Sequence, residues 1–111
     1  MNQTQMLKGI LEGCVLQIVK DKARYSQEIV ELLKQKGFTN VSEGTLFPML
    51  LRLDKDGLFD TEKVSTSIGP NRKYYILNEK GEIQLNQFIT AWNDLKLKVD
   101  NILIKGDYEN E

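Results

Sequence analysis

The sequence predicts a mainly α-helical domain that carries one two-stranded β-hairpin and ends in a long helix. Three segments before Gly57 have apolar residues at steps of three and four, the spacing of amphipathic helices. The chain then changes to alternating β-branched and aromatic residues on both sides of Gly69-Pro70, which indicates a hairpin. After Asn78 the apolar residues follow a heptad pattern, which is typical of paired helices.

Composition excludes several classes of protein. The chain has 111 residues, the size of one domain, with no His and one Cys. It therefore lacks the commonest general base and the commonest metal ligand, and Cys14 cannot form a disulfide within the chain. We expect no enzyme activity, no cofactor and no metal site. No apolar run approaches the ~20 residues that span a bilayer, and the first residues lack a signal-peptide core, so we expect a cytoplasmic protein.

The formal net charge of −1 is an average of two unlike parts. Residues 1–80 carry 12 basic and 10 acidic side chains, whereas residues 81–111 carry 3 basic and 6 acidic ones. Ordinary surface variation can produce such a split, and so can a basic nucleic-acid-binding unit joined to an acidic helix.

The first predicted helix has one broad apolar face. Leu16 widens that face, so we expect it to be covered both by its own domain and by a second chain. Cys14 is expected to be a core residue, because the nearest cation along the helix that could lower the pKa of its thiol, Lys8, is distant. The apolar face comprises Leu7, Ile10, Leu11, Cys14, Val15, Ile18 and Val19.

The second predicted helix begins with Ser26 as its N-cap and ends at Gly37. Tyr25 before the cap and Val30 after it have the spacing of a hydrophobic staple. Its buried face comprises Ile29, Leu32 and Leu33.

The third predicted helix covers residues 42–58, with Ser42 as N-cap and Gly57 as the C-terminal stop. Gly44 and Pro48 in its first half are unfavourable within a helix. One interpretation is a helix end that approaches a DNA phosphate closely, because its N–H groups and dipole attract anions. The other is a tight crossing between the second and third helices. Its apolar face comprises Leu46, Leu50 and Leu53.

The predicted hairpin has a polar loop at residues 67–71 and two cations, Arg72 and Lys73, at the start of its return strand. Such a tip can lie along a phosphate backbone. The alternative is a solvated hairpin whose charged edges discourage association. Tyr74 and Tyr75 point to opposite faces of the strand, so at least one of them is expected in the core.

Three helices followed by a hairpin have the order of a winged helix-turn-helix. Three strings add a more specific resemblance: LKGILEGCVLQIV at the start, SEGTLFPMLLRLDKDGL in the third helix and GPNRKYYILNEKG in the hairpin. Together the three strings, within about residues 7–103, resemble the PadR family of bacterial regulators, the phenolic-acid-decarboxylase repressor type. The resemblance implies a dimeric winged-helix transcription factor that binds double-stranded DNA through its third helix and wing.

Two departures from the family pattern concern the expected DNA contacts. Phe47 stands where members often have Tyr, so one hydrogen bond to a phosphate or base edge is absent. Residues 23–26, Ala-Arg-Tyr-Ser, replace a pair of aromatic residues flanked by Gly. The family motifs fall on Ser42, Gly44, Thr45, Leu46, Pro48, Leu53 and Gly57 in the third helix, and on Arg72, Lys73, Tyr74, Tyr75, Leu77 and Gly81 in the wing.

The last predicted helix begins near Asn78 and carries a heptad seam of Leu85, Phe88, Trp92, Leu95, Val99 and Ile102. A helix that projects past a small domain cannot bury this seam within its own chain, so we expect a homodimer. The seam is shorter than three heptads and needs help from another element, for which the first helix is the candidate.

Trp92 in the middle of the seam has two interpretations. The resemblance implies that an aromatic residue here stacks flat hydrophobic ligands at the dimer interface. The alternative is an anchor that only buries apolar area. Leu11, Val15 and Phe88 are the side chains expected near such a pocket.

The sequence therefore predicts a DNA-binding repressor that binds an inverted repeat as a homodimer and is released by a flat hydrophobic ligand. The alternatives are a repressor without a ligand and a winged helix that binds protein. The expected parts are a DNA-binding domain at 1–78, a dimerisation helix at 79–104 and a disordered acidic tail at 105–111. Expected DNA contacts are Ser42, Gly44, Thr45, Phe47, Arg52, Arg72, Lys73 and Tyr74, and expected ligand or dimer residues are Leu11, Val15, Phe88, Trp92, Leu95 and Val99.

Overall fold

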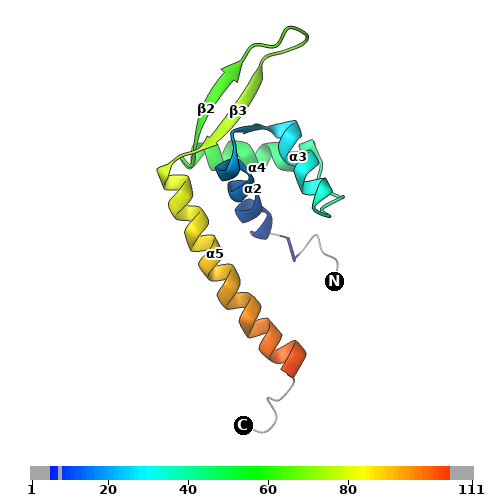
Figure 1. The fold of residues 1–111 in the computed structure, drawn as a ribbon, viewed down its shortest axis with the longest axis vertical. Helices are drawn as coiled ribbons and strands as arrows, with labels where there is room; N and C mark the ends of the chain where they lie inside the picture. The colour runs from blue at the N-terminus through cyan, green and yellow to red at the C-terminus, as the bar shows by residue number, and fades with distance from the viewer. Residues whose placement is uncertain (1–5, 8, 106–111) are drawn as a thin grey trace.

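The computed structural model describes residues 6, 7 and 9–105 and confirms a mainly helical chain with a wing and a long last helix (Figure 1). The expected acidic tail lies outside the described residues, apart from the backbone of Lys105. The elements in chain order are α2 (Ile10–Asp21), β1 (Arg24–Tyr25), α3 (Ser26–Gln35), α4 (Glu43–Lys55), β2 (Phe59–Val64), β3 (Arg72–Leu77), α5 (Glu79–Asp100) and the π-helical turn η1 (Asn101–Lys105).

Capping residues and a glycine define the helix ends, and one predicted cap needs correction. Ser42 caps α4 by accepting a hydrogen bond from the Thr45 N–H at 3.3 Å, and Gly57 ends it with φ of 82°. Ser26, expected as an N-cap, is instead the first residue of α3, and Tyr25 occupies the cap position. The hydroxyl of Ser26 is then available to donate to Glu43.

The wing belongs to a three-stranded antiparallel sheet in the order β1-β3-β2, one strand more than the predicted hairpin. Arg24 pairs with Tyr75 and Tyr25 pairs with Tyr74, while β2 and β3 pair from Phe59 opposite Leu77 to Val64 opposite Arg72. A two-residue strand is too short to show an alternating pattern, which is why sequence periodicity does not reveal β1.

The hydrophobic core lies between α2, α3, α4 and the base of the sheet. It comprises Leu11, Val15, Leu16, Val19, Ile29, Val30, Leu33, Val41, Leu46, Leu50, Leu53, Leu58, Phe59, Tyr75 and Leu85. Tyr75 is 1% exposed, so it is the core member of the tyrosine pair. Leu85 is the last core residue along the chain, although α5 still packs on α2 at Phe88.

Close backbone approach fixes the start of α5 against the domain. A Cβ at Gly13 of α2 would overlap the ring of Phe88, and a Cβ at Gly81 would overlap the Leu58 carbonyl oxygen. Asn78 caps α5 by accepting a hydrogen bond from the Gly81 N–H at 2.9 Å. Beyond these residues the helix extends away from the other elements (Figure 1). Among the described residues, no helix is long and apolar enough to cross a membrane.

Candidate functional site

A hollow of about 350 Å³ lies where the wing meets the N-terminal ends of α3 and α4. We call it the wing hollow. Its lining residues are Tyr25, Ser26, Gln27, Glu43, Phe47, Ile68, Pro70, Asn71, Arg72, Lys73 and Tyr75. Three segments that are far apart in the sequence therefore form one concave surface, and it includes three of the predicted DNA contacts.

Glu43 in the first turn of α4 lines the wing hollow, whereas the predicted DNA contacts of the same turn lie beside the hollow and do not line it. Ser42, Gly44 and Thr45 are all exposed, and the Ser42 and Thr45 hydroxyl oxygens are 3.3 Å apart. A Cβ at Gly44 would meet only the Ser42 Oγ, at 3.7 Å, so this glycine does not serve a tight helix crossing. The Thr45 N–H already donates to the Ser42 Oγ, but the N–H groups before it have no acceptor within the helix and lie at the positive end of its dipole, which favours a phosphate nearby.

Between Thr45 and Arg52 the exposed face of α4 is apolar, and the exposed cations Arg52 and Lys55 follow this stretch. Phe47 is 48% exposed and Leu51, one turn later, is 45% exposed, with exposed Pro48 between them. The nearby carboxylate of Glu43 accepts a hydrogen bond from the Ser26 hydroxyl at 3.3 Å. This part of the helix offers an aromatic ring and aliphatic carbon to a partner.

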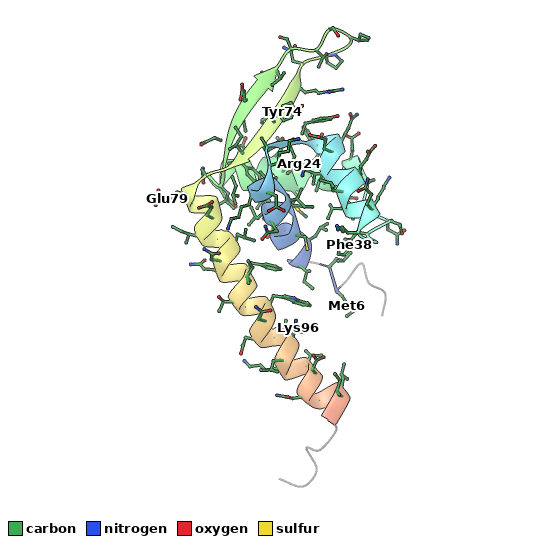
Figure 2. All side chains as sticks on the ribbon, viewed as in Figure 1. Met6, Arg24, Phe38, Tyr74, Glu79 and Lys96 are labelled. Atoms are coloured by element: carbon green, nitrogen blue, oxygen red, sulfur yellow. The ribbon has the colours of Figure 1, made fainter. Side chains whose placement is uncertain are left out.

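The cations that were predicted to contact DNA have different surroundings in the structure. The Arg72 guanidinium lies 4.5 Å from the centre of the Tyr25 ring, and that ring packs edge-on against Tyr74 at 5.3 Å. Stacking on Tyr25 orients the Arg72 guanidinium at the base of the wing loop. Arg72 remains exposed to solvent. Figure 2 shows Tyr74 on the wing above Arg24 of β1.

Lys73 and Arg52 are each paired with a carboxylate. The Lys73 Nζ lies 3.3 Å from the Asp54 Oδ2 and 5.3 Å from the centre of the Tyr75 ring. Arg52 pairs with Glu12, which joins α4 to α2. These ion pairs reduce the local positive charge, so Arg72 is the cation of this set best placed to meet a phosphate.

Tyr75 stays neutral at the base of the wing hollow. Burial raises the pKa of Tyr75, the Lys73 ammonium lowers it, and the Asp54 carboxylate raises it. Its hydroxyl has no hydrogen-bond partner among the described residues.

A second concave surface, of about 690 Å³, lies between α2, the end of α3 and the middle of α5. We call it the apolar groove. Phe38 and Met6 lie at this end of the domain (Figure 2). The groove is lined by Met6, Leu7, Ile10, Gly13, Cys14, Gln17, Ile18, Leu33, Lys36, Phe38, Leu85, Phe88, Ile89 and Trp92.

The groove brings together some of the predicted ligand residues and not others. Phe88 and Trp92 line it, whereas Leu11 and Val15 are 5% and 0% exposed inside the core and do not line it. Residues on the same face of a helix differ in depth, and periodicity alone could not separate Val15 from Cys14. Cys14, predicted as a core residue, is instead partly buried, because it packs against the core and lines the groove. Burial raises the pKa of its thiol.

The heptad seam changes its surroundings along α5. Leu85 is 1% exposed, whereas Trp92, Leu95 and Val99 are 36%, 52% and 42% exposed. Ile102 in η1 is 58% exposed. The seam is therefore buried in the core at Leu85 and exposed to solvent at Ile102.

Two features of the site were missed by sequence reasoning. The stack of Arg72 on Tyr25 depends on β1, and Phe38 reaches the groove from the turn after α3. The unusual segment at residues 23–26 was the available signal for the first, since it places an aromatic residue beside an expected DNA-binding helix.

Comparisons with known proteins agree on one family. Residues 15–87 match the transcriptional regulator PadR-like family. A PadR-like transcriptional regulator from Bacillus cereus is 43% identical, with 90% of this chain and 97% of that chain covered and a TM-score of 0.81. A Streptococcus transcriptional regulator is 40% identical, with 88% and 96% covered and a TM-score of 0.79.

A more distant structure shares the fold alone. Bacillus subtilis PadR, solved in complex with operator DNA, is 16% identical, with a TM-score of 0.66 over 72% of this chain and 46% of that chain.

Proposed function

This chain belongs to the PadR-like family of transcriptional regulators, and we propose that it represses transcription as a homodimer bound to an inverted-repeat operator. The observation that carries the proposal is the wing hollow, where the first half of α4 and Arg72 of the wing flank one exposed concave surface. In winged-helix proteins such a helix enters the major groove. The wing then lies beside it along the backbone.

The proposed contacts divide into two kinds. Ser42, Gly44 and Thr45 bring backbone N–H groups and hydroxyls to a phosphate, and Arg72 meets a flanking phosphate from the wing. Tyr74 acts indirectly, since it holds the Tyr25 ring on which Arg72 stacks. Lys73 and Arg52 contribute less than the sequence suggested, because each is paired with a carboxylate.

The dimer is proposed to form along the exposed half of the α5 seam. Leu95 and Val99 are apolar and half exposed, and they follow the part of α5 that packs on α2. A second copy would bury both seams, and the two α4 helices would then face half-sites about 34 Å apart, one turn of DNA.

The apolar groove is the proposed site for a flat hydrophobic effector. Its volume of about 690 Å³ lies within the range of ~300–1,000 Å³ usual for small-molecule sites. Trp92 and Phe88 supply aromatic faces, and the groove is continuous with the proposed dimer seam. A ligand that binds one dimer geometry better would shift the spacing of the two α4 helices and release DNA.

The direct test is binding of the purified protein to fluorescent DNA duplexes selected from a random pool, measured at several salt concentrations. We expect a selected inverted repeat to bind more tightly than unselected DNA. The Arg72→Ala/Lys73→Ala double variant should bind all sequences more weakly and with a smaller salt slope. If no sequence is enriched, a winged helix that binds protein becomes the better explanation.

Addition of flat aromatic compounds to the same complex tests the effector. Release that is abolished in Trp92→Ala supports a sensing groove. Release that is retained in full in Trp92→Ala contradicts a role for Trp92, and the absence of release by a panel of such compounds favours a repressor without a ligand.

A further inference from the structure

Between Thr45 and Arg52, the exposed face of α4 lacks the donors and acceptors that usually read bases. Arg52 is paired with Glu12, and the Glu43 carboxylate is bonded to Ser26. The side chains that remain prominent in the middle of the helix are Phe47 and Leu51, at 48% and 45% exposure. This stretch of the helix therefore has no side chain that could make the bidentate hydrogen bonds by which Arg or Asn distinguish bases.

Phe47 and Leu51 differ in where they lie. Phe47 lines the wing hollow together with Ile68 and Pro70 of the wing loop, whereas Leu51 lies outside that lining. The Phe47 ring is therefore on the surface between helix and wing, which is the surface proposed to face DNA. Burial of a phenyl ring against polar base edges would cost free energy, so its partner should be apolar.

The major groove offers one prominent apolar group, the C5-methyl of thymine. Guanine, cytosine and adenine lack this methyl group, so a phenyl ring gains less apolar contact from them than from thymine. A tyrosine at this place could also donate a hydrogen bond to a phosphate or a base, but Phe47 has only its ring.

We propose that Phe47 determines sequence specificity by packing on a thymine C5-methyl group at one position of each half-site. The inference rests on the proposed function and adds to it the chemical group that the helix reads. It makes Phe47 a residue that discriminates bases, in contrast to Ser42, Thr45 and Arg72, which position the protein on phosphates.

The experiment replaces each thymine of an in vitro selected duplex, one at a time, by deoxyuridine. This change removes the methyl group and keeps every hydrogen bond of the base pair. We expect one position in each half-site to lose affinity about fourfold when substituted, the order expected for one buried methyl group. Selected half-sites without a thymine, or equal affinity for every deoxyuridine duplex, would overturn the inference.

Three variants identify the residue responsible. Phe47→Ala should bind the thymine and deoxyuridine duplexes equally, whereas Phe47→Tyr, which keeps the ring, should still distinguish them. Leu51→Ala is the matched control, because it removes a similarly exposed apolar side chain from the same helix outside the wing hollow. If Leu51→Ala abolishes the discrimination and Phe47→Ala preserves it, the assignment to Phe47 is wrong. Circular dichroism melts confirm that each variant is folded.

The outcomes separate this inference from the proposed function. Selection of a duplex that binds tightly but shows no dependence on thymine methyl groups leaves the DNA-binding function standing and removes the role of Phe47. Failure to select any duplex removes both.

Discussion

Most leucine side chains are buried in the domain of α2–α4, but those in the second half of α5 are exposed. Leu50 in the domain is 0% exposed, whereas Leu95 in α5 is 52% exposed. Burial of a leucine side chain stabilises a fold by about 1.5–3 kcal/mol, but only where another surface covers it. The domain therefore has a core of its own, whereas we expect the exposed half of the seam to be covered by a partner, as proposed above.

This comparison also separates the two parts of the proposed function. Contact with DNA belongs to the domain and its wing, and the pairing of two such domains belongs to α5. Changes in one part should therefore alter a different observable from changes in the other.

The largest effect is expected from Leu95→Asp. A charge in the seam should prevent pairing, because a carboxylate would be buried without a partner. We expect the mass measured by sedimentation equilibrium to be halved, and the affinity for an inverted repeat to fall by about 10²–10⁴-fold as two-site binding is abolished.

Asn93→Asp is its matched control, since it adds the same charge to the same helix away from the seam. This variant should remain dimeric. A dimer in Leu95→Asp as well would show that pairing does not use the seam.

The next effect tests whether the domain is self-sufficient. In the Leu95→Asp background, Leu50→Ala should lower the free energy of unfolding by about 2.7–5 kcal/mol, measured by urea denaturation. Val99→Ala in the same background should change it by less than about 0.5 kcal/mol, because Val99 has little to pack against in one chain. A Leu95→Asp chain that does not fold would contradict the self-sufficiency of the domain.

Gly13→Ala addresses the junction between the two regions. Its new methyl group would overlap the Phe88 ring, so we expect the free energy of unfolding to fall by about 1–3 kcal/mol. Adding Phe88→Leu should recover part of that decrease. Gly44→Ala is the contrasting control, because its methyl group meets only the Ser42 Oγ and should stabilise α4 by up to ~1 kcal/mol. Equal effects at the two glycines would argue against the close packing of α5 on α2.

Within the domain, the two wing cations should differ. Arg72→Ala should reduce the salt slope of DNA binding by about 0.9 for each phosphate that the protein no longer neutralises, hence roughly 2 for a dimer. Lys73→Ala should reduce it less, because Asp54 already pairs with that ammonium. Fluorescence anisotropy from low to moderate salt measures both slopes, and a larger change in Lys73→Ala would reverse their order.

The smallest effect concerns Cys14 in the apolar groove. Burial raises the pKa of this thiol, so as pH rises the unfolded chain ionises before the folded one does. Alkylation by iodoacetamide should therefore begin at higher pH in the folded protein than in urea, and stability should fall as pH rises above the thiol's ordinary pKa. Alkylation should also be slower in the wild type than in Leu95→Asp if a partner covers the groove. Identical pH profiles for the folded and unfolded chains would contradict the burial.

Much of the fold could be predicted because its signals are local. The cap at Ser42, the stop at Gly57, the start of the last helix near Asn78 and its heptad residues each depend on neighbours within a few positions. Strand alternation also predicted that at least one of Tyr74 and Tyr75 lies in the core, and the structure shows that Tyr75 does. Local patterns could not predict how deeply each residue is buried, as the core positions of Leu11 and Val15 show.

The site was harder to predict because it depends on contacts between distant residues. The pairs of Arg52 with Glu12 and Lys73 with Asp54 join different elements and redistribute the charge that the sequence assigned to DNA. The stack of Arg72 on Tyr25 requires a two-residue strand with no pattern of its own. Phe47 was identified as a departure from the family, but its place beside Ile68 in the wing hollow needed the structure.

The central claim is that two copies joined through α5 read one inverted repeat. The most direct measurement is the affinity and stoichiometry of the wild-type protein on a selected duplex, before and after five base pairs are inserted between the half-sites. The insertion turns one half-site by about half a helical turn. We predict two chains per duplex and a fall in affinity toward that of Leu95→Asp. One chain per duplex, or an affinity unchanged by the insertion, would contradict the claim.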